Sequence, residues 1–442
     1  MADQQVSPSQ VAQPAPTASA PVAIVPTLAV DKLPQFRDAI VDGNVPQMVL
    51  LMISCALDMR SSDIHVEPEE RTIRVRYRVD GVLRPIIEYP NNMHPAVVSR
   101  IKIMSNLKID EQRIPQDGRS HVTTKEGKEM DLRVSTFPTV NGEKIVMRIQ
   151  DKSRTIPTLE ELGIEGSSFE SLKKALDAPN GIILTSGPTG SGKTTTLYSC
   201  LNILNTLDVN ILTIEDPVEI QMNGLNQSQV HPDITYTFEM GLRTALRQDP
   251  DIIMVGEIRD RETIDVAIEA SLTGHLVLST IHTNSAVETI TRISNMGVPN
   301  YLMTGTLNLI IAQRLVRKIC ESCKAKTDAE PYMLERVKKA LATLYPSEAK
   351  RFEQRIAQMT FSKGAGCDAC GKSGYLGRVG IYEVLLVNNA IRKGILDNTS
   401  NVDMEKIARE NGMVTLEQDG ILKVLAGLTT LEEVYSVARE AE

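Results

Sequence analysis

The chain has 442 residues, 42% of them hydrophobic and 24% charged, and a net charge of −8 at pH 7. These values are ordinary for a globular protein and exclude wholesale disorder, a collagen-like fibre and a membrane channel. The acidic balance argues against a dedicated nucleic-acid binder, which is usually basic. Six cysteines in a chain of this length do not indicate a disulfide scaffold.

The first 30 residues contain five Pro and seven Ala, and no Lys or Arg precedes Lys32. This composition predicts a disordered Pro/Ala-rich tail over residues 1–32 and lacks the charged start of a secretory signal. No run approaches the roughly 18 apolar residues expected of a membrane span. We therefore expect a cytoplasmic chain without a transmembrane segment.

The next 120 residues predict a small α+β domain, residues 33–152. Pro46–Met59 has the pattern of an amphipathic helix, and Thr72–Val79 alternates between apolar residues and arginines, as strands do. Asp80-Gly81 is a hairpin signal, and Glu143–Ile149 is a further strand candidate.

From residue 160 to 312, short apolar runs alternate with helical stretches, which predicts a doubly wound parallel sheet. The runs are Ile182–Leu184, Ile211–Ile214, Ile252–Val255 and Leu276–Leu278. Thr158–Glu161 is a candidate capping box that opens this unit. Residues 313–380 hold two cysteine pairs separated by a charged helical stretch, Pro331–Met359. Residues 381–442 are expected to be helical, with Thr429 or Thr430 capping the last helix.

A phosphate-binding loop follows the first of these runs. Its sequence is Gly187-Pro188-Thr189-Gly190-Ser191-Gly192-Lys193-Thr194, and a helical run starts at Thr195. In this motif, backbone N–H groups cradle phosphate oxygens, the Lys reaches the β- and γ-phosphates and the Thr hydroxyl binds Mg²⁺. The strand before it and the helix after it make a chance glycine-rich turn a poor alternative.

Two later strands end in acidic residues, where the carboxyl ends of parallel strands place ligands. Glu215-Asp216 follows one run, and Gly256-Glu257 follows another. We expect Glu257 to support the metal, through water, and Glu215 to orient the attacking water. The alternative is that both pairs are helix N-caps or lie in surface turns. His282 lies just past a third strand, where it would sense the γ-phosphate, whereas His275 starts that strand and is expected to be structural.

The cysteine pairs are Cys320-x-x-Cys323 and Cys367-x-x-Cys370. Four thiolates suit one closed, structural Zn²⁺ site. Four free thiols or a redox pair are the alternatives, but no thioredoxin-like unit surrounds either pair. Cys55 and Cys200 lie in apolar helices and are expected in the core.

These motifs resemble the secretion ATPases of type II secretion systems and type IV pilus assembly. The resemblance runs from about Ser62 to the C-terminus and includes the phosphate loop, Thr213–Pro217, Gly256–Asp260 and the four cysteines. Its remaining markers are Ser62–Pro68, Arg76–Gly81, Pro115–Arg119, Asp131–Thr136, Gly241–Pro250, Thr273–Thr283 and Ala312–Leu315.

The resemblance implies a RecA-like P-loop core behind a PAS-like α+β domain, assembled as a homohexamer that binds ATP. It also implies arginines that contact the phosphates, for which Arg119, Arg133, Arg243 and Arg247 are the candidates; a solvated basic face is the alternative for each. The partner would be an inner-membrane platform protein, with peripheral membrane association through it. Many relatives carry an extra helical N-terminal docking domain that is expected to be missing here.

Three other functions stay open. A pilus-retraction motor shares the core chemistry, but the four cysteines resemble the assembly and secretion motors. A conjugation-type or virulence secretion ATPase would differ in its partners. A nucleic-acid motor shares the phosphate loop, but the chain has no basic tract. A non-enzymatic adaptor is not among them, because it would need a degraded phosphate site and this one is intact.

Overall fold

The computed structural model describes residues 32–123, 129–151 and 155–438. The chain forms two compact units, residues 1–150 and 151–442. The segment predicted as a tail lies, apart from Lys32, outside the described residues. Among the residues described, no helix is long and apolar enough to cross a membrane.

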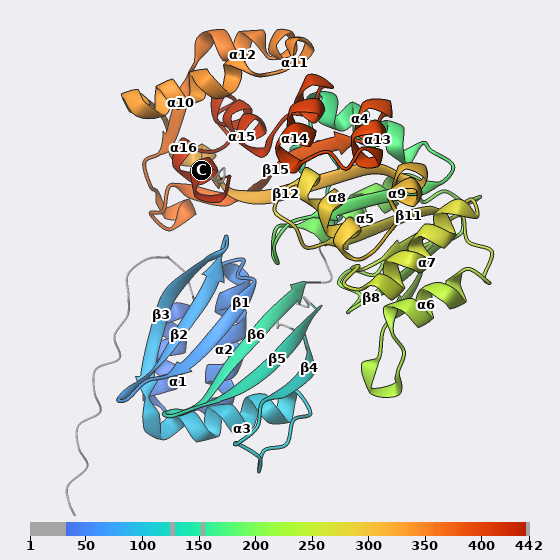
Figure 1. The fold of residues 1–442 in the computed structure, drawn as a ribbon. Coiled ribbons are helices and arrows are strands. Elements are labelled where there is room, and N and C mark those ends of the chain that lie inside the picture. Colours follow the sequence, from blue (N-terminus) through green and yellow to red (C-terminus); the bar gives the residue numbers. More distant parts are fainter. Residues whose placement is uncertain (1–31, 124–128, 152–154, 439–442) are drawn as a thin grey trace, which may run out of the picture. The chain divides into compact units, whose positions relative to one another are not determined.

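The smaller unit is an α+β domain in which helices pack on one face of a sheet (Figure 1). The sheet order is β3-β2-β1-β6-β5-β4. Its elements are α1 (Leu33–Val41), α2 (Val45–Asp58), β1 (Asp63–Pro68), β2 (Thr72–Val79), β3 (Val82–Pro90), α3 (His94–Met104), β4 (Gln116–Thr123), β5 (Glu129–Thr139) and β6 (Gly142–Asp151).

Strand β2 has the predicted bounds, because its alternation buries Ile73, Val75, Tyr77 and Val79 and leaves the arginines on the other face. The predicted hairpin also forms. Val79 pairs with Val82, and both Asp80 (φ 49°) and Gly81 (φ 85°) have positive φ, as a two-residue turn between twisted strands requires.

The larger unit is a RecA-like α/β fold around a mixed sheet of order β15-β12-β7-β11-β10-β8-β9. Every pair is parallel except β12 with β15. The strands are β7 (Gly181–Ser186), β8 (Ile211–Glu215), β9 (Asn226–Gln229), β10 (Ile252–Val255), β11 (Leu276–Ile281), β12 (Leu307–Ile319) and β15 (Tyr375–Leu386).

Helices cover both faces of this sheet (Figure 1), and its strands are buried almost throughout, as the uninterrupted apolar runs predict. The helices are α4 (Gly166–Leu176), α5 (Lys193–Leu204), α6 (Phe238–Ala245), α7 (Arg261–Leu272), α8 (Ala286–Asn295), α9 (Asn300–Thr306), α13 (Asn389–Leu396), α14 (Asn401–Glu410), α15 (Leu416–Leu425) and α16 (Leu431–Val437).

The stretch between the cysteine pairs folds into three short helices beside a two-stranded sheet. They are α10 (Pro331–Ala342), α11 (Pro346–Arg351) and α12 (Glu353–Gln358), with strands β13 (Lys324–Thr327) and β14 (Phe361–Gly364).

One local prediction needs correction, and two capping predictions are confirmed. Residues 381–386 are not helical: they complete strand β15, which pairs with β12 along an otherwise open sheet edge, and the C-terminal helices start at Asn389. The capping-box bonds of Thr158 and Glu161 do form, but they close a turn that ends at Gly163 (φ 91°), and helix α4 begins only at Gly166. Thr430, not Thr429, caps α16.

Candidate functional site

The phosphate loop joins β7 to α5, so its backbone lies at the N-terminus of a helix. Gly187, Gly190 and Gly192 all have positive φ. A Cβ on Gly187 would lie 2.6 Å from the Gln313 carbonyl oxygen, and one on Gly192 would lie 2.8 Å from Gln313 Nε2. Glycine is therefore required at both positions by backbone angle and by space.

Gln313 on β12 holds the phosphate loop through two side-chain hydrogen bonds. Its Nε2 donates to the Ser191 carbonyl (2.7 Å), and its Oε1 accepts from Thr196 Oγ1 (2.8 Å). Both bonds are buried, so removing the amide would leave buried polar groups without partners. Gln313 belongs to the marker Ala312–Leu315, and a polar residue within the buried run of β12 was a signal for a specific role.

Lys193 is folded back onto the loop. Its Nζ donates to the carbonyl oxygens of Gly187 (2.8 Å) and Pro188 (3.2 Å). Burial lowers the pKa of Lys193; the charge of Glu257 opposes this shift, and that of Arg314 adds to it. Thr194 and Thr195 follow in the first turn of α5, where their side chains are partly exposed.

Glu257 follows β10 at the carboxyl edge of the sheet, where its charge acts on Lys193. Its carboxylate pairs with Arg259 and lies 3.4 Å from His282 Nε2. The strand ends are held by Ser279 Oγ and Thr280 Oγ1, which donate to the carbonyls of Val255 and Gly256. The structure thus brings Lys193, Glu257 and His282 together at the carboxyl edge of the sheet.

Glu215, unlike Glu257, is buried and has its carboxylate surrounded by hydrogen-bond donors. It is 2% exposed, and its carboxylate accepts hydrogen bonds from Tyr198, Thr213 (2.6 Å) and Gln227 (3.1 Å). Burial raises the pKa of Glu215, against the effect of these three donors. The sequence pointed to the acid but not to the tyrosine, which comes from the buried face of α5.

The candidate arginines lie in both units. Arg119 and Arg133 are register partners on β4 and β5 of the smaller unit. In the larger unit, Arg243 on α6 pairs with Glu239 (3.0 Å), and Arg247 is exposed just beyond that helix. Their contacts with phosphate stay predictions. His275, which was expected to be structural, has its Nδ1 2.8 Å from the Ala270 carbonyl oxygen in the last turn of α7.

Glu383 on β15 is a buried acid near the loop that carries His282. Its Oε1 accepts from the Ala286 N–H at the start of α8 (2.8 Å). Burial raises the pKa of Glu383 from 4.5 to about 7, although the N–H groups of Ala286 and Leu416 oppose the shift.

The pKa of Glu383 is higher in the folded chain than in the unfolded chain. Its contribution to the free energy of unfolding is therefore fully present below pH 4.5 and is lost as the pH rises through 7. Glu383→Gln should remove this loss and gain about 3 kcal/mol relative to the native chain between pH 4.5 and pH 8. Urea unfolding followed by circular dichroism checks this, with exposed Glu410→Gln as the control. A constant difference across that range would contradict it.

The four cysteines form the second site. Their ligand atoms all lie within 4.8 Å of one another, and the Sγ–Sγ distances are 3.8 Å for Cys320–Cys367, 3.9 Å for Cys323–Cys370 and 3.7 Å for Cys367–Cys370. A disulfide needs about 2.05 Å, whereas sulfurs about 2.3 Å from a tetrahedral Zn²⁺ are about 3.8 Å apart. The cluster is therefore compatible with zinc.

Backbone N–H groups surround these sulfurs. Gly366 donates to Cys323 Sγ, and Cys367 and Gly374 donate to Cys370 Sγ, at 3.2–3.3 Å. Burial disfavours the Cys370 thiolate, but the N–H groups of Cys367 and Gly374 and the thiols of Cys367 and Cys323 outweigh this effect and lower the pKa of Cys370 to about 6. Thiolates are the form that binds a metal. Cys55 and Cys200 are buried in the hydrophobic cores, as expected.

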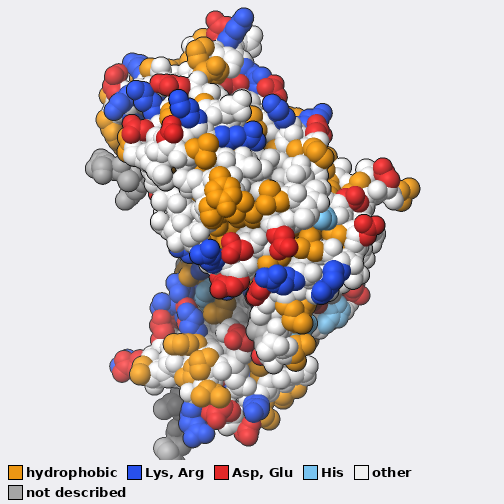
Figure 2. All heavy atoms as spheres, turned by 45° about the vertical axis from the view of Figure 1, so that its right-hand side comes forward, with side chains coloured by type: hydrophobic (Ala, Val, Ile, Leu, Met, Phe, Trp, Pro, Cys, Tyr) orange, Lys and Arg blue, Asp and Glu red, His pale blue; other side chains and the backbone are white. Residues whose placement is uncertain are grey.

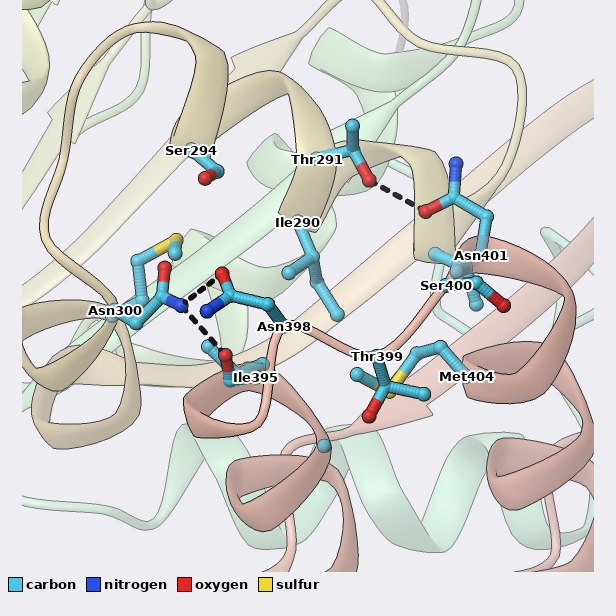
Figure 3. Close-up of a pocket in the computed structure, with 13 residues that line it drawn as sticks. Ile290, Thr291, Ser294, Asn300, Ile395, Asn398, Thr399, Ser400, Asn401 and Met404 are labelled. Atoms are coloured by element: carbon cyan, nitrogen blue, oxygen red, sulfur yellow. Dashed lines mark hydrogen bonds between the residues drawn. The ribbon is translucent and has the colours of Figure 1, made fainter.

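A separate pocket of about 350 Å³ lies among α8, α9, α13 and α14 (Figure 3). Asn300 Nδ2 donates there to the Ile395 carbonyl (2.7 Å) and to Asn398 Oδ1 (2.8 Å), and Thr291 donates to Asn401 (2.5 Å). Its lining carries no charged side chain, so it lacks the cations that a triphosphate needs. On the face in Figure 2, acidic and basic side chains are intermingled, with no broad basic surface for nucleic acid.

Comparison with known proteins identifies the family. Residues 39–436 match the family model described as type II/IV secretion system protein. The chain is 45% identical over 406 residues to the type IV pilus assembly ATPase PilB of Myxococcus xanthus (91% of this chain, 69% of the relative). It is 46% identical over 414 residues to the type II secretion system protein E of Xanthomonas campestris (93% and 70%).

Among solved structures, the pilus retraction motor PilT with bound ADP is similar at 27% identity and a TM-score of 0.57, over 88% of this chain and 97% of that one. The ATPase DotB of Legionella pneumophila shares the fold, with a TM-score of 0.62 at 22% identity over 88% and 94%. The chain therefore belongs to the type II/IV secretion system protein family and is an ATPase of that family.

Proposed function

We propose that this chain is a hexameric cytoplasmic ATPase that powers type IV pilus assembly or type II-like protein secretion through an inner-membrane platform protein. The observation that carries the proposal is the convergence of Lys193, Glu257 and His282 beside an intact phosphate loop. The printed functions of the PilB and protein E relatives supply the process. Peripheral membrane association through the platform is part of the proposal.

In this scheme, the N–H groups of Gly187–Thr195 hold the phosphates at the N-terminus of α5. Lys193 moves from the loop carbonyls to the β- and γ-phosphates, and the Thr194 hydroxyl is the ligand for Mg²⁺. The metal, when bound, neutralises phosphate charge. Glu257 supports it through water, and His282, which already contacts Glu257, senses the γ-phosphate.

The arginines act where charge develops during phosphoryl transfer. We assign Arg119 and Arg133 of the smaller unit and Arg243 and Arg247 of the larger unit to this role, across a domain or subunit boundary. The proposed division of the larger unit is a core over 160–312, a zinc-binding subdomain over 313–380 and a C-terminal part over 381–442, whose helices begin at Asn389. Strand β12 runs through the first of these boundaries.

Glu215 is proposed to orient the attacking water. Glu215→Gln keeps the shape of the side chain but removes the charge, so kcat should fall by about 100-fold or more while ATP binding changes little. Tyr198→Phe is the matched control, because it removes one hydrogen bond to the same carboxylate and leaves the carboxylate in place. Steady-state phosphate release gives kcat. Unchanged turnover in Glu215→Gln would remove Glu215 from the scheme.

The cellular test is deletion of the gene in the organism that carries it, scored by counting surface pili and measuring secreted proteins. Loss of either product, restored by the native chain but not by a variant without turnover, would support an assembly or secretion motor. Surplus pili in the deletion strain would point to retraction instead. Unchanged pili and secretion would overturn the proposal.

A further inference from the structure

Arg314 lies at the start of the phosphate loop, on the strand beside it. The parallel pairing of β12 with β7 ends at Ala312 opposite Ser186, so the next residues of β12 run beside Gly187. Arg314 Nη1 donates to the Gln313 carbonyl (3.1 Å), the same oxygen that excludes a Cβ from Gly187. The guanidinium therefore lies next to the loop.

Lys193 and Arg314 bring two positive charges to this place. Lys193 binds the carbonyls of Gly187 and Pro188, and the charge of Arg314 lowers its pKa. Burial lowers the pKa of Arg314 itself, with Glu383 and Glu288 opposing. Within the described part of the chain, Arg314 hydrogen-bonds Gln313 and Asn284 and pairs with no carboxylate. Two partly buried cations without a paired acid suit a polyanion.

The other side of Arg314 holds the loop that follows His282. Its Nη2 donates to the carbonyl oxygen (3.0 Å) and to Oδ1 (3.3 Å) of Asn284. Asn284 precedes Ser285, the N-cap of α8. These bonds use three of the five N–H groups of an arginine, which leaves two for an anion.

We propose that Arg314 is a further phosphate-binding cation of the ATP site, which contacts the terminal phosphate of a nucleoside triphosphate beside Lys193 and positions the loop 282–285. This inference rests on the proposed function. It makes the start of α8 responsive to the triphosphate, because one guanidinium joins the phosphate and Asn284. Near its middle, α8 contacts the start of α14 through the hydrogen bond from Thr291 to Asn401 (Figure 3).

The test compares a non-hydrolysable ATP analogue with ADP, each with Mg²⁺, by equilibrium binding to the full chain. Arg314→Gln should weaken binding of the ATP analogue about 10-fold or more and that of ADP less than about 2-fold. Arg314→Lys, which keeps the charge without the planar fork, should lie between Arg314→Gln and the native chain. Arg292→Gln, an exposed arginine of α8, should match the native chain.

Asn284→Ala separates the two halves of the proposal. It should keep the preference for the triphosphate but lose the protection from hydrogen exchange that the ATP analogue gives to the first turn of α8. Equal weakening of both nucleotides in both Arg314 variants, or no weakening in either, would overturn the role of Arg314. A native chain that binds neither nucleotide would overturn the proposed function first.

Discussion

Glu257→Gln is expected to abolish ATP turnover and leave nucleotide binding nearly unchanged. The carboxylate is 14% exposed and lies between Arg259 and His282, so an amide of the same shape fits the space. Without the negative charge of Glu257, the site would lose the carboxylate proposed to support the metal and the acidic partner of His282. Both lie where charge develops during phosphoryl transfer. We expect kcat to fall by about 10²–10³-fold, measured as steady-state phosphate release.

The matched control for this variant is Glu262→Gln. Glu262 is an exposed acid in the first turn of α7, five residues further along the chain, and its replacement should leave kcat within about 2-fold of the native value. The equilibrium dissociation constant of a non-hydrolysable ATP analogue should stay the same in both variants. If Glu257→Gln turns over ATP at the native rate, Glu257 has no part in the reaction.

The second large effect concerns the four cysteines. We expect one zinc per chain by elemental analysis, and loss of that zinc in Cys367→Ser, because a hydroxyl does not replace a thiolate in a four-sulfur site. Structural zinc contributes on the order of 10 kcal/mol in small zinc domains. The variant should therefore unfold the segment between the two pairs, seen as faster hydrogen exchange in β13 and β14.

Cys200→Ser is the control for the zinc experiment, because Cys200 is buried in a hydrophobic core and is distant in sequence from both cysteine pairs. This variant should still bind one zinc per chain. Native protein that is folded, carries no metal and has four titratable thiols at these positions would contradict the assignment.

The sequence predicted the elements with strong periodicity and the residues of well-defined motifs. Strand β2 and its hairpin follow from alternation and from Asp80-Gly81, and the four parallel runs follow from their continuous apolar character. The phosphate loop needed only its glycines, lysine and flanking elements. In each case the determining interactions are local, or depend on one face being buried.

The parts that failed depend on partners distant in the chain. Residues 381–386 are apolar enough for either a helix or a strand, and only the open edge of β12 decides for the strand. The roles of Gln313 and Tyr198 arise because β12 and α5 lie against the phosphate loop and Glu215.

Strand β12 also links the two sites. It supports the phosphate loop through Gln313 and reaches Cys320 seven residues later, roughly 20 Å along an extended chain. Strand β12 is paired with β15 over this length. Arg317 forms an ion pair with Glu433 and a cation–π contact with the ring of Tyr375. Strand β12 therefore connects the residue that supports the phosphate loop, Gln313, to the cysteine cluster in one continuous strand, which is paired with β15 along most of its length.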